Sequence, residues 1–353
     1  MFPIQITPES AVKELSAFNQ KLSKGFETLS QIADVTPGVT EKEVVYEEDK
    51  LKLMHFKAKV PNPHGVPVLI IYALVNRPYM ADLQDDRSTI KGLLENGLDV
   101  YLIDWGYPDP GDRYLELQDY IDGYIKNCVD HIRRAHNLDK INILGICMGG
   151  TISACFCSFY PELVKNLVLM VTPIDFHSCD DRLHEWVEGV DVDLMVDTLG
   201  NLPGSVLNQT FQAMSPMALG LKKYVDMVYL MDDKKALENF LRMEYWINDS
   251  PDQPGETLRQ YVRDMYQRNA LVAGNVTIGG RKVDLANLTM PILNVYATLD
   301  HLVPPDGSKI LGKLCKSSDY NEMSFKGGHI GIYVSGRAQK EVPAGIAQWV
   351  KER

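Results

Sequence analysis

Residues 141–150 read Ile-Asn-Ile-Leu-Gly-Ile-Cys-Met-Gly-Gly, and the expected fold follows from this stretch. The apolar run at 141–146 is typical of a strand that is buried on both faces. It leads into the pattern glycine–x–nucleophile–x–glycine, with Cys147 as the nucleophile, and a helix-like stretch begins near Thr151. Glycines at such a place let strand and helix approach closely around a strained turn. We therefore expect Cys147 at the carboxyl edge of a sheet, where open α/β folds bind ligands.

Strands and helices alternate on both sides of this motif. Apolar runs predict further strands at residues 67–75, 99–104, 167–172, 291–297 and 320–325. Helical patterns occupy residues 86–97, 121–132 and 339–351. Such alternation indicates parallel strands that are joined by right-handed helical crossovers.

The alternation stops at residues 173–290, which are mainly helical, for example at 224–246 and 256–267. We interpret 173–290 as a cap, or lid, inserted between late strands of a core made of residues 1–172 and 291–353. The first 40 or so residues have no strong pattern and are expected to be peripheral. Together with the Cys147 motif, this organisation predicts an α/β-hydrolase fold, with a mostly parallel central sheet flanked by helices.

Two residues near the end of the chain complete a candidate catalytic triad. Asp300 follows the predicted strand 291–297, and His329 follows the strand 320–325 in Gly-Gly-His-Ile-Gly. The order nucleophile, acid, histidine is the one that this motif requires. In the usual roles His329 deprotonates Cys147 and Asp300 orients the imidazole. The alternatives are a buried structural cysteine, a turn aspartate and a core histidine, and the adjacent His301 either lines the site or is structural.

Two backbone amides are candidates for the oxyanion hole. The turn after Cys147 directs the Met148 amide toward a developing oxyanion. A second donor is expected from the loop that follows strand 67–75, where Val75 is preferred over Asn76. An ordinary connecting loop is the alternative interpretation of this second segment.

A cysteine at this position narrows the chemistry. Transfer of an acyl group from a thioester donor to Cys147 exchanges one thioester for another, so the acyl enzyme stays activated. An alcohol acceptor can then take the acyl group to form an ester, and a cap that excludes water favours transfer over hydrolysis. A hydrolase such as a dienelactone-hydrolase-like enzyme uses the same three residue types, so residue chemistry alone does not separate the two.

Composition excludes several classes of protein. The 353 residues carry 36 Lys and Arg against 47 Asp and Glu, a net charge of −11, which argues against general binding of nucleic acid or anionic membrane. No apolar run approaches the roughly 20 residues of a transmembrane helix, and the N-terminus lacks a signal-peptide pattern. The six cysteines contain no CxxC pair, so we expect reduced thiols and no metal site.

Several long segments resemble the catalytic subunit of class III polyhydroxyalkanoate (PHA) synthases, the short type that works with a separate accessory subunit. These segments are residues 72–80, 86–94, 99–108, 142–147, 250–253, 300–305 and 327–335. One departure is that the residue after the cysteine, often Gln in this family, is Met148 here. Because the oxyanion donor is a backbone amide, we expect catalysis to survive this change.

The resemblance implies polymerisation of (R)-3-hydroxyacyl-CoA, with 3-hydroxybutyryl-CoA as the expected substrate, into a polyester with release of CoA. Cys147 would carry the acyl group or the growing chain, His329 would activate Cys147, and Asp300 would either orient His329 or help to activate the attacking hydroxyl. No cofactor is expected, since CoA is a product carried by the substrate. The resemblance also implies an accessory subunit, self-association, and a cytoplasmic enzyme that moves to polyester granules.

Two alternatives remain at this point: a cysteine-dependent thioesterase or hydrolase, and a granule-associated scaffold without activity. An acidic chain that binds an anionic CoA thioester also needs local positive charge. We therefore expect a cluster of Lys and Arg near the entrance of the cap.

Overall fold

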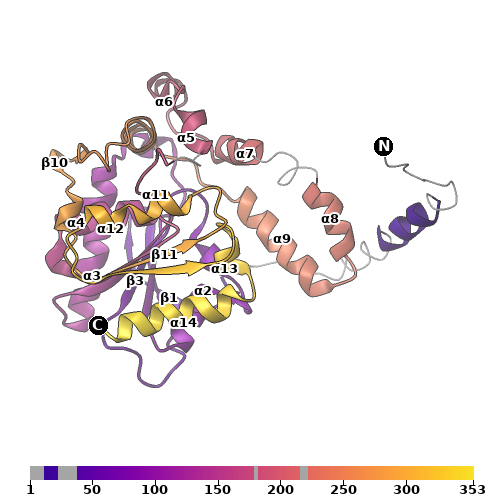
Figure 1. Cartoon of the computed structure of the whole chain (residues 1–353), viewed down its shortest axis with the longest axis horizontal. Coiled ribbons are helices and arrows are strands. Elements are labelled where there is room, and N and C mark those ends of the chain that lie inside the picture. Colours follow the sequence, from indigo (N-terminus) through magenta and orange to yellow (C-terminus); the bar gives the residue numbers. More distant parts are fainter. Residues whose placement is uncertain (1–11, 23–37, 179–181, 215–221) are drawn as a thin grey trace.

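The computed structural model describes residues 12–22, 38–178, 182–214 and 222–353. Its centre is an eight-stranded sheet with the strand order β1-β2-β6-β3-β7-β8-β11-β12, and helices cover both faces (Figure 1). The six strands from β6 to β12 are parallel, whereas β1 and β2 join antiparallel at one edge. The strands are β1 (Lys42–Glu48), β2 (Leu51–Phe56), β3 (Val68–Ile71), β6 (Val100–Asp104), β7 (Ile141–Ile146), β8 (Val164–Met170), β11 (Ile292–Ala297) and β12 (Tyr320–Phe325).

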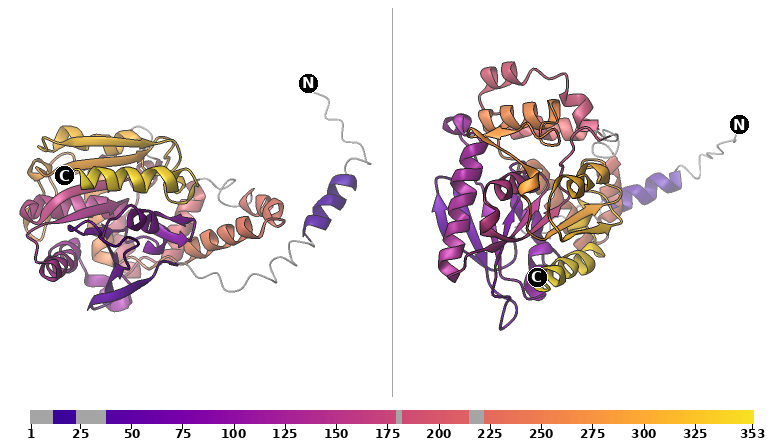
Figure 2. Two further views of the ribbon diagram at one scale, coloured as in Figure 1. Left: turned by 90° about the horizontal axis from the view of Figure 1, so that it is seen from below. Right: turned by 60° about the vertical axis from the view of Figure 1, so that its left-hand side comes forward.

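The helices that cover the sheet form two groups. Helix α2 (Thr89–Glu95) packs against the closing helix α14 (Ala338–Lys351), and α3 (Lys126–His136) and α4 (Met148–Phe159) lie away from them (Figures 1 and 2). Every residue of β3 and β7 is buried, as expected for parallel strands with both faces covered. The strand and helix patterns that alternate in the sequence therefore correspond to the strands and helices of this α/β core.

Most of the predicted elements are confirmed, with shifted ends. The strands predicted at 141–146, 291–297 and 320–325 are β7, β11 and β12. The predicted helix at 121–132 begins as a π-helical turn, η3 (Asp119–Ile125), and continues as α3. The prediction of a strand at 67–75 is wrong in its second half, because β3 ends at Ile71 and the chain then forms a loop. Strands β1 and β2, and the short pair β4 (Asp82–Gln84) and β5 (Arg87–Ser88), were not predicted.

The segment between the neighbouring strands β8 and β11 is mainly helical. Its helices are α5 (Arg182–Val187), α6 (Val192–Leu199), α7 (Gly204–Met214), α8 (Lys223–Leu230), α9 (Lys234–Asn248), α10 (Gly255–Tyr261), η6 (Val262–Gln267) and η7 (Leu285–Asn287). A short hairpin, β9 (Thr277–Ile278) and β10 (Arg281–Lys282), precedes β11. The pattern at 224–246 divides into α8 and α9, because the Asp233 side chain caps α9 by accepting the amides of Lys235 and Ala236. That 173–290 acts as a cap stays a prediction.

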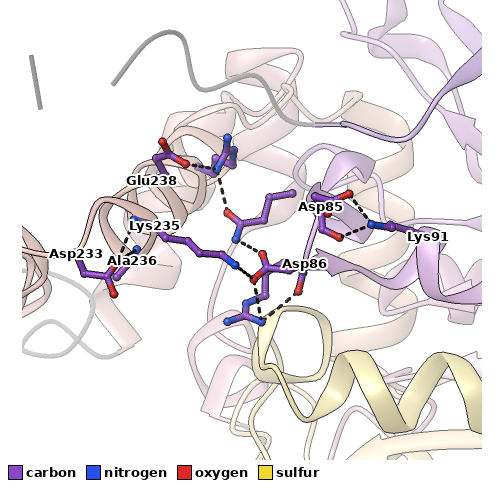
Figure 3. A network of polar contacts seen from close by, with 10 residues as sticks. Asp85, Asp86, Lys91, Asp233, Lys235, Ala236 and Glu238 are labelled. Carbon is purple, nitrogen blue, oxygen red and sulfur yellow. Dashed lines mark hydrogen bonds and ion pairs between the residues drawn. The ribbon is translucent and has the colours of Figure 1, made fainter. Parts of the chain in front are cut away.

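Helix α9 reaches the core through a polar contact at the β4–β5 pair (Figure 3). Lys235 pairs with Asp86 at 2.7 Å, and Arg242 donates to Gln84 at 3.0 Å. Much of the N-terminal segment predicted to be peripheral lies outside the described residues. Its residues 12–22 form a helix that projects away from the sheet (Figure 1).

Candidate active site

Cys147 occupies a strained turn between β7 and α4. Its backbone has φ 53° and ψ −127°, a conformation that residues with a Cβ rarely adopt. The Cys147 amide donates to the Met170 carbonyl of the neighbouring strand at 2.9 Å, which ties the turn to the sheet. The side chain is only partly buried, and it stands at the carboxyl end of β7, as predicted.

The glycines after Cys147 are required by close packing. A Cβ atom at Gly149 would overlap the Ile71 carbonyl oxygen and the Tyr72 backbone, and one at Gly150 would overlap the Thr172 side chain. Helix α4 can therefore begin against β3 and β8 only with glycine at these positions. This contact sets the direction of α4 and, with it, the placement of Cys147.

Asp300 and His329 meet although they follow different strands. The His329 Nδ1 atom lies 2.8 Å from Oδ2 of Asp300, and Oδ1 of Asp300 accepts the amides of Leu302 and Val303, each at 2.9 Å. The Asp300 side chain is fully buried, and that of His329 is 11% exposed. Both carboxylate oxygens of Asp300 are thus occupied, so its orientation is fixed.

Cys147 lies close enough to His329 to influence the ionisation of its ring, so the structure brings Cys147, His329 and Asp300 together in one cluster. Burial alone would lower the pKa of His329. The electrostatic influence of Cys147 and Asp300, together with the hydrogen bond to Asp300, outweighs burial and raises the pKa of His329 to about 10. The ring is therefore arranged to accept and hold a proton beside the thiol.

The two candidate oxyanion donors lie at a helix start and in a loop, where backbone amides are left without acceptors. Met148 is the first residue of α4, so its amide is one of the four at the helix start that have no intrahelical acceptor. Val75 belongs to the loop after β3, in which Asn76 has φ 60°. Among the described residues, no acceptor is found for the amides of Val75 and Asn76. The amides of Met148 and Val75 are therefore available to a ligand, and their role as oxyanion donors stays a prediction.

Two tyrosines near Cys147 were missed by the sequence reasoning. Tyr333 lies one helical turn after His329, and its hydroxyl is buried with no hydrogen-bond partner among the described residues. Burial, followed by the nearby Tyr72, Cys147 and Asp300, raises the pKa of Tyr333 well above 10, and burial raises that of Tyr72. The hydroxyl of Tyr333 thus stays protonated at any physiological pH. The sequence feature that could have pointed to Tyr333 is its position four residues after His329.

The structure says less about His301 and about the groups expected to bind CoA. His301 is exposed beside Asp300, and its role as a site-lining residue stays a prediction. Within the described ranges no group of His, Cys, Asp and Glu could hold a metal ion, and none of the described helices is long and apolar enough to cross a bilayer. Arg259, Arg263 and Arg268 line one open groove of about 550 Å³ on α10 and η6, but each pairs with acidic residues. The expected basic cluster for CoA stays a prediction.

Comparisons with known proteins agree with this fold. Residues 66–335 match the family model described as alpha/beta hydrolase fold, and residues 13–93 match the one described as Poly-beta-hydroxybutyrate polymerase (PhaC) N-terminus. A solved structure of a candidate lipase from Sulfolobus solfataricus shares the fold, with a TM-score of 0.56 and 17% identity over 88% of this chain and 99% of that one.

Curated relatives extend over the whole chain. Poly(3-hydroxyalkanoate) polymerase subunit PhaC of Allochromatium vinosum is 54% identical over 100% of both chains. The PhaC subunit of Thiocystis violacea is 53% identical over 100% of both, and that of Synechocystis is 52% identical over 100% of this chain and 96% of its own. With an α/β-hydrolase core and full-length similarity at this level, the chain belongs to the PhaC family of poly(3-hydroxyalkanoate) polymerase subunits.

Proposed function

We propose that this protein is a PHA synthase, an acyltransferase that joins (R)-3-hydroxyacyl-CoA units into a polyester and releases CoA. The observation that carries the proposal is the cluster of Cys147, His329 and Asp300 in a chain 54% identical, over its full length, to a PhaC subunit. The expected substrate is 3-hydroxybutyryl-CoA. The reaction needs no cofactor, because CoA arrives with the substrate.

The first step loads the enzyme. His329 takes the proton of the Cys147 thiol, and the sulfur attacks the thioester carbonyl of the substrate. The amides of Met148 and Val75 stabilise the negative charge that develops on the carbonyl oxygen. The bond to the CoA sulfur breaks, CoA leaves with the proton from His329, and the acyl group is bound to Cys147 as a thioester. The raised pKa of His329 supports its role as the proton acceptor.

The second step forms the ester. The hydroxyl of a second 3-hydroxyacyl group attacks the acyl carbon on Cys147, and His329 takes the hydroxyl proton. The bond between the acyl carbon and the Cys147 sulfur breaks, and the proton returns to the sulfur. A thioester is consumed and an oxygen ester is formed, so the transfer runs downhill.

The surroundings of Asp300 favour an orienting role. Oδ1 holds two backbone amides, Oδ2 contacts His329 and the side chain is fully buried, so a substrate hydroxyl has no access to Asp300 in this arrangement. Asp300 then fixes the His329 ring with Nδ1 toward the carboxylate, which leaves Nε2 for Cys147 and for the hydroxyl. Direct activation of the hydroxyl by Asp300 would require these contacts to break.

An accessory subunit, self-association and a cytoplasmic location at polyester granules are part of the proposal. The description of several relatives as polymerase subunits supports a partner chain.

The test is incubation with 3-hydroxybutyryl-CoA, in which thiol release and sedimentable polymer are followed with and without a candidate accessory subunit. Polymer formation that is lost in Cys147→Ala supports the proposal. Free hydroxy acid in amounts equal to the CoA released would identify a thioesterase instead. Neither product, with the accessory subunit present, would favour a granule scaffold, and polymer formed by Cys147→Ala would exclude Cys147 as the nucleophile.

A further inference from the structure

One segment of the helical insertion is bound to the loop that carries the candidate oxyanion donor. We call residues 246–253 the anchor segment and residues 74–79 the oxyanion loop. Gln253 donates to the Leu74 carbonyl at 3.2 Å, and the side chain of Asn76 donates to the Ser250 hydroxyl at 2.5 Å. These two contacts bracket Val75 on both sides.

The rest of the oxyanion loop is held by the same segment. The Trp246 indole donates to the Arg77 carbonyl at 2.8 Å, and the Tyr79 hydroxyl donates to Asp249 at 2.7 Å. The other oxygen of Asp249 accepts the hydroxyl of Tyr107, which follows β6. Four side-chain hydrogen bonds therefore join the anchor segment to four residues of the oxyanion loop.

The anchor segment is itself rigidly supported. Gln253 is 3% exposed, and its backbone pairs with Leu202 in both directions. The Ser250 hydroxyl donates a hydrogen bond to Oδ1 of Asn208 in α7, and the Asn208 side-chain NH₂ donates to the Ile247 carbonyl. Because these groups are buried or partly buried and mutually bonded, a shift of one is transmitted to the next.

We propose that Gln253, Ser250 and the side chain of Asn76 are positioning residues for acyl transfer, which hold the Val75 amide where the oxyanion forms. The proposal rests on the proposed function. Asn76 has φ 60°, a conformation that costs free energy unless neighbouring contacts maintain it. The bond from Asn76 to Ser250 is such a contact. Because β3 ends at Ile71, the loop is outside the sheet, and its hydrogen bonds to the insertion would hold the Val75 amide in place.

The test uses two variants of the full chain, Asn76→Gly and Gln253→Ala. Glycine accepts the positive φ, so Asn76→Gly removes the side-chain contact and keeps the backbone allowed. The rate of CoA release from 3-hydroxybutyryl-CoA is measured together with the rate of alkylation of Cys147 by iodoacetamide. Alkylation forms no oxyanion, so it reports on Cys147 and His329 but not on Val75.

Each variant is expected to slow CoA release through kcat by about 10- to 100-fold, less than the loss of a whole oxyanion donor, while KM and alkylation stay unchanged. Ser250→Ala should slow CoA release similarly. Combined with Asn76→Gly it should add little, because both changes break the same bond.

Two matched controls separate positioning from general loosening. Gln84→Ala breaks a different contact between the insertion and the core, because the Gln84 side chain bonds to Arg242 and Asp86 and, among the described residues, to none of the oxyanion loop or the anchor segment. Asn137→Gly changes another asparagine with positive φ, at the end of α3. Both should keep wild-type CoA release. The inference is overturned if Gln84→Ala is equally slow, if alkylation falls in parallel, or if Gln253→Ala is as fast as wild type. Failure of the proposed function is a different result, in which the wild-type chain itself releases no CoA.

Discussion

His329 and Asp300 are joined by a 2.8 Å contact between Nδ1 and Oδ2 at the ends of two adjacent parallel strands, β11 and β12. The other carboxylate oxygen of Asp300, Oδ1, accepts hydrogen bonds from the amides of Leu302 and Val303. Because the carboxylate is fixed by the backbone, it fixes the imidazole in turn. The geometry is that of a catalytic acid that orients a base rather than one that meets the substrate.

The first prediction concerns Asp300→Asn. The amide can still accept from the two backbone amides, but its NH₂ group would face Nδ1 of His329 and favour the wrong tautomer. We expect CoA release to fall by about 10³- to 10⁴-fold, as when a triad aspartate is replaced by asparagine. The assay is steady-state CoA release from 3-hydroxybutyryl-CoA, with circular dichroism to show that the variant is folded. Activity near the wild-type level would show that Asp300 does not orient the base.

The second prediction concerns the ionisation of His329. Burial lowers its pKa, and Cys147 and Asp300 raise it to about 10, so removing Cys147 in Cys147→Ala should bring the pKa of His329 down. NMR titration of the imidazole resonances measures this shift directly. A pKa of His329 that is the same in the variant and the wild type would mean that the two residues do not interact.

The same raised pKa makes stability depend on pH. Folded His329 binds its proton more tightly than in the unfolded chain, where its pKa is near 6.5. Its contribution to stability is therefore full below about pH 6.5 and is lost as the pH rises through about 10. In Cys147→Ala this loss should occur at lower pH, which urea unfolding across the same pH range would detect.

The sequence was sufficient for the centre of the sheet because strands such as β3 and β7 are buried on both faces. Residues 141–146 form a continuous apolar run, and β7 is buried at every position. Cys147, Asp300 and His329 were predictable for a related reason, since each follows a strand and the carboxyl ends of parallel strands meet at one edge. Strand β1 was missed because it is an edge strand whose residues, Lys-Glu-Val-Val-Tyr-Glu-Glu, are mostly exposed and mixed in polarity.

Contacts that join distant parts of the chain could not be predicted from local pattern. Gln253 lies 179 residues from Leu74, and nothing in the spacing of either residue indicates their hydrogen bond. The end of β3 at Ile71 has the same origin, because the apolar residues that follow it pack into a loop held by the insertion rather than into the sheet. Tertiary packing therefore overrode the apolar pattern at residues 72–75.

The third prediction concerns Gly149→Ala. The new methyl group would overlap the Ile71 carbonyl oxygen, so α4 must move away from β3. We expect unfolding free energy to fall by about 3 kcal/mol, the upper end for overpacking in a core. Gly123→Ala is the matched control, because a Cβ there meets no atom within 4 Å and alanine favours helix over glycine. Equal stability of the two variants in urea unfolding would contradict the close approach of α4 and β3.

The fourth prediction concerns the selectivity of the thiols. Burial raises the pKa of Cys155 to about 12 and raises those of Cys128 and Cys157 still further, whereas Cys147 is only partly buried. Because thiolates react and buried thiols are inaccessible, iodoacetamide at mildly alkaline pH should modify Cys147 well before these three.

Peptide mapping by mass spectrometry identifies the modified cysteine at each time point. Preincubation with 3-hydroxybutyryl-CoA should protect Cys147, since the acylated sulfur cannot be alkylated, and should leave the reactivity of the partly buried Cys315 unchanged. Cys315 is thus an internal control within the same molecule. Protection of both cysteines would indicate a general closure of the structure on substrate binding, and protection of neither would mean that no acyl group is carried by Cys147.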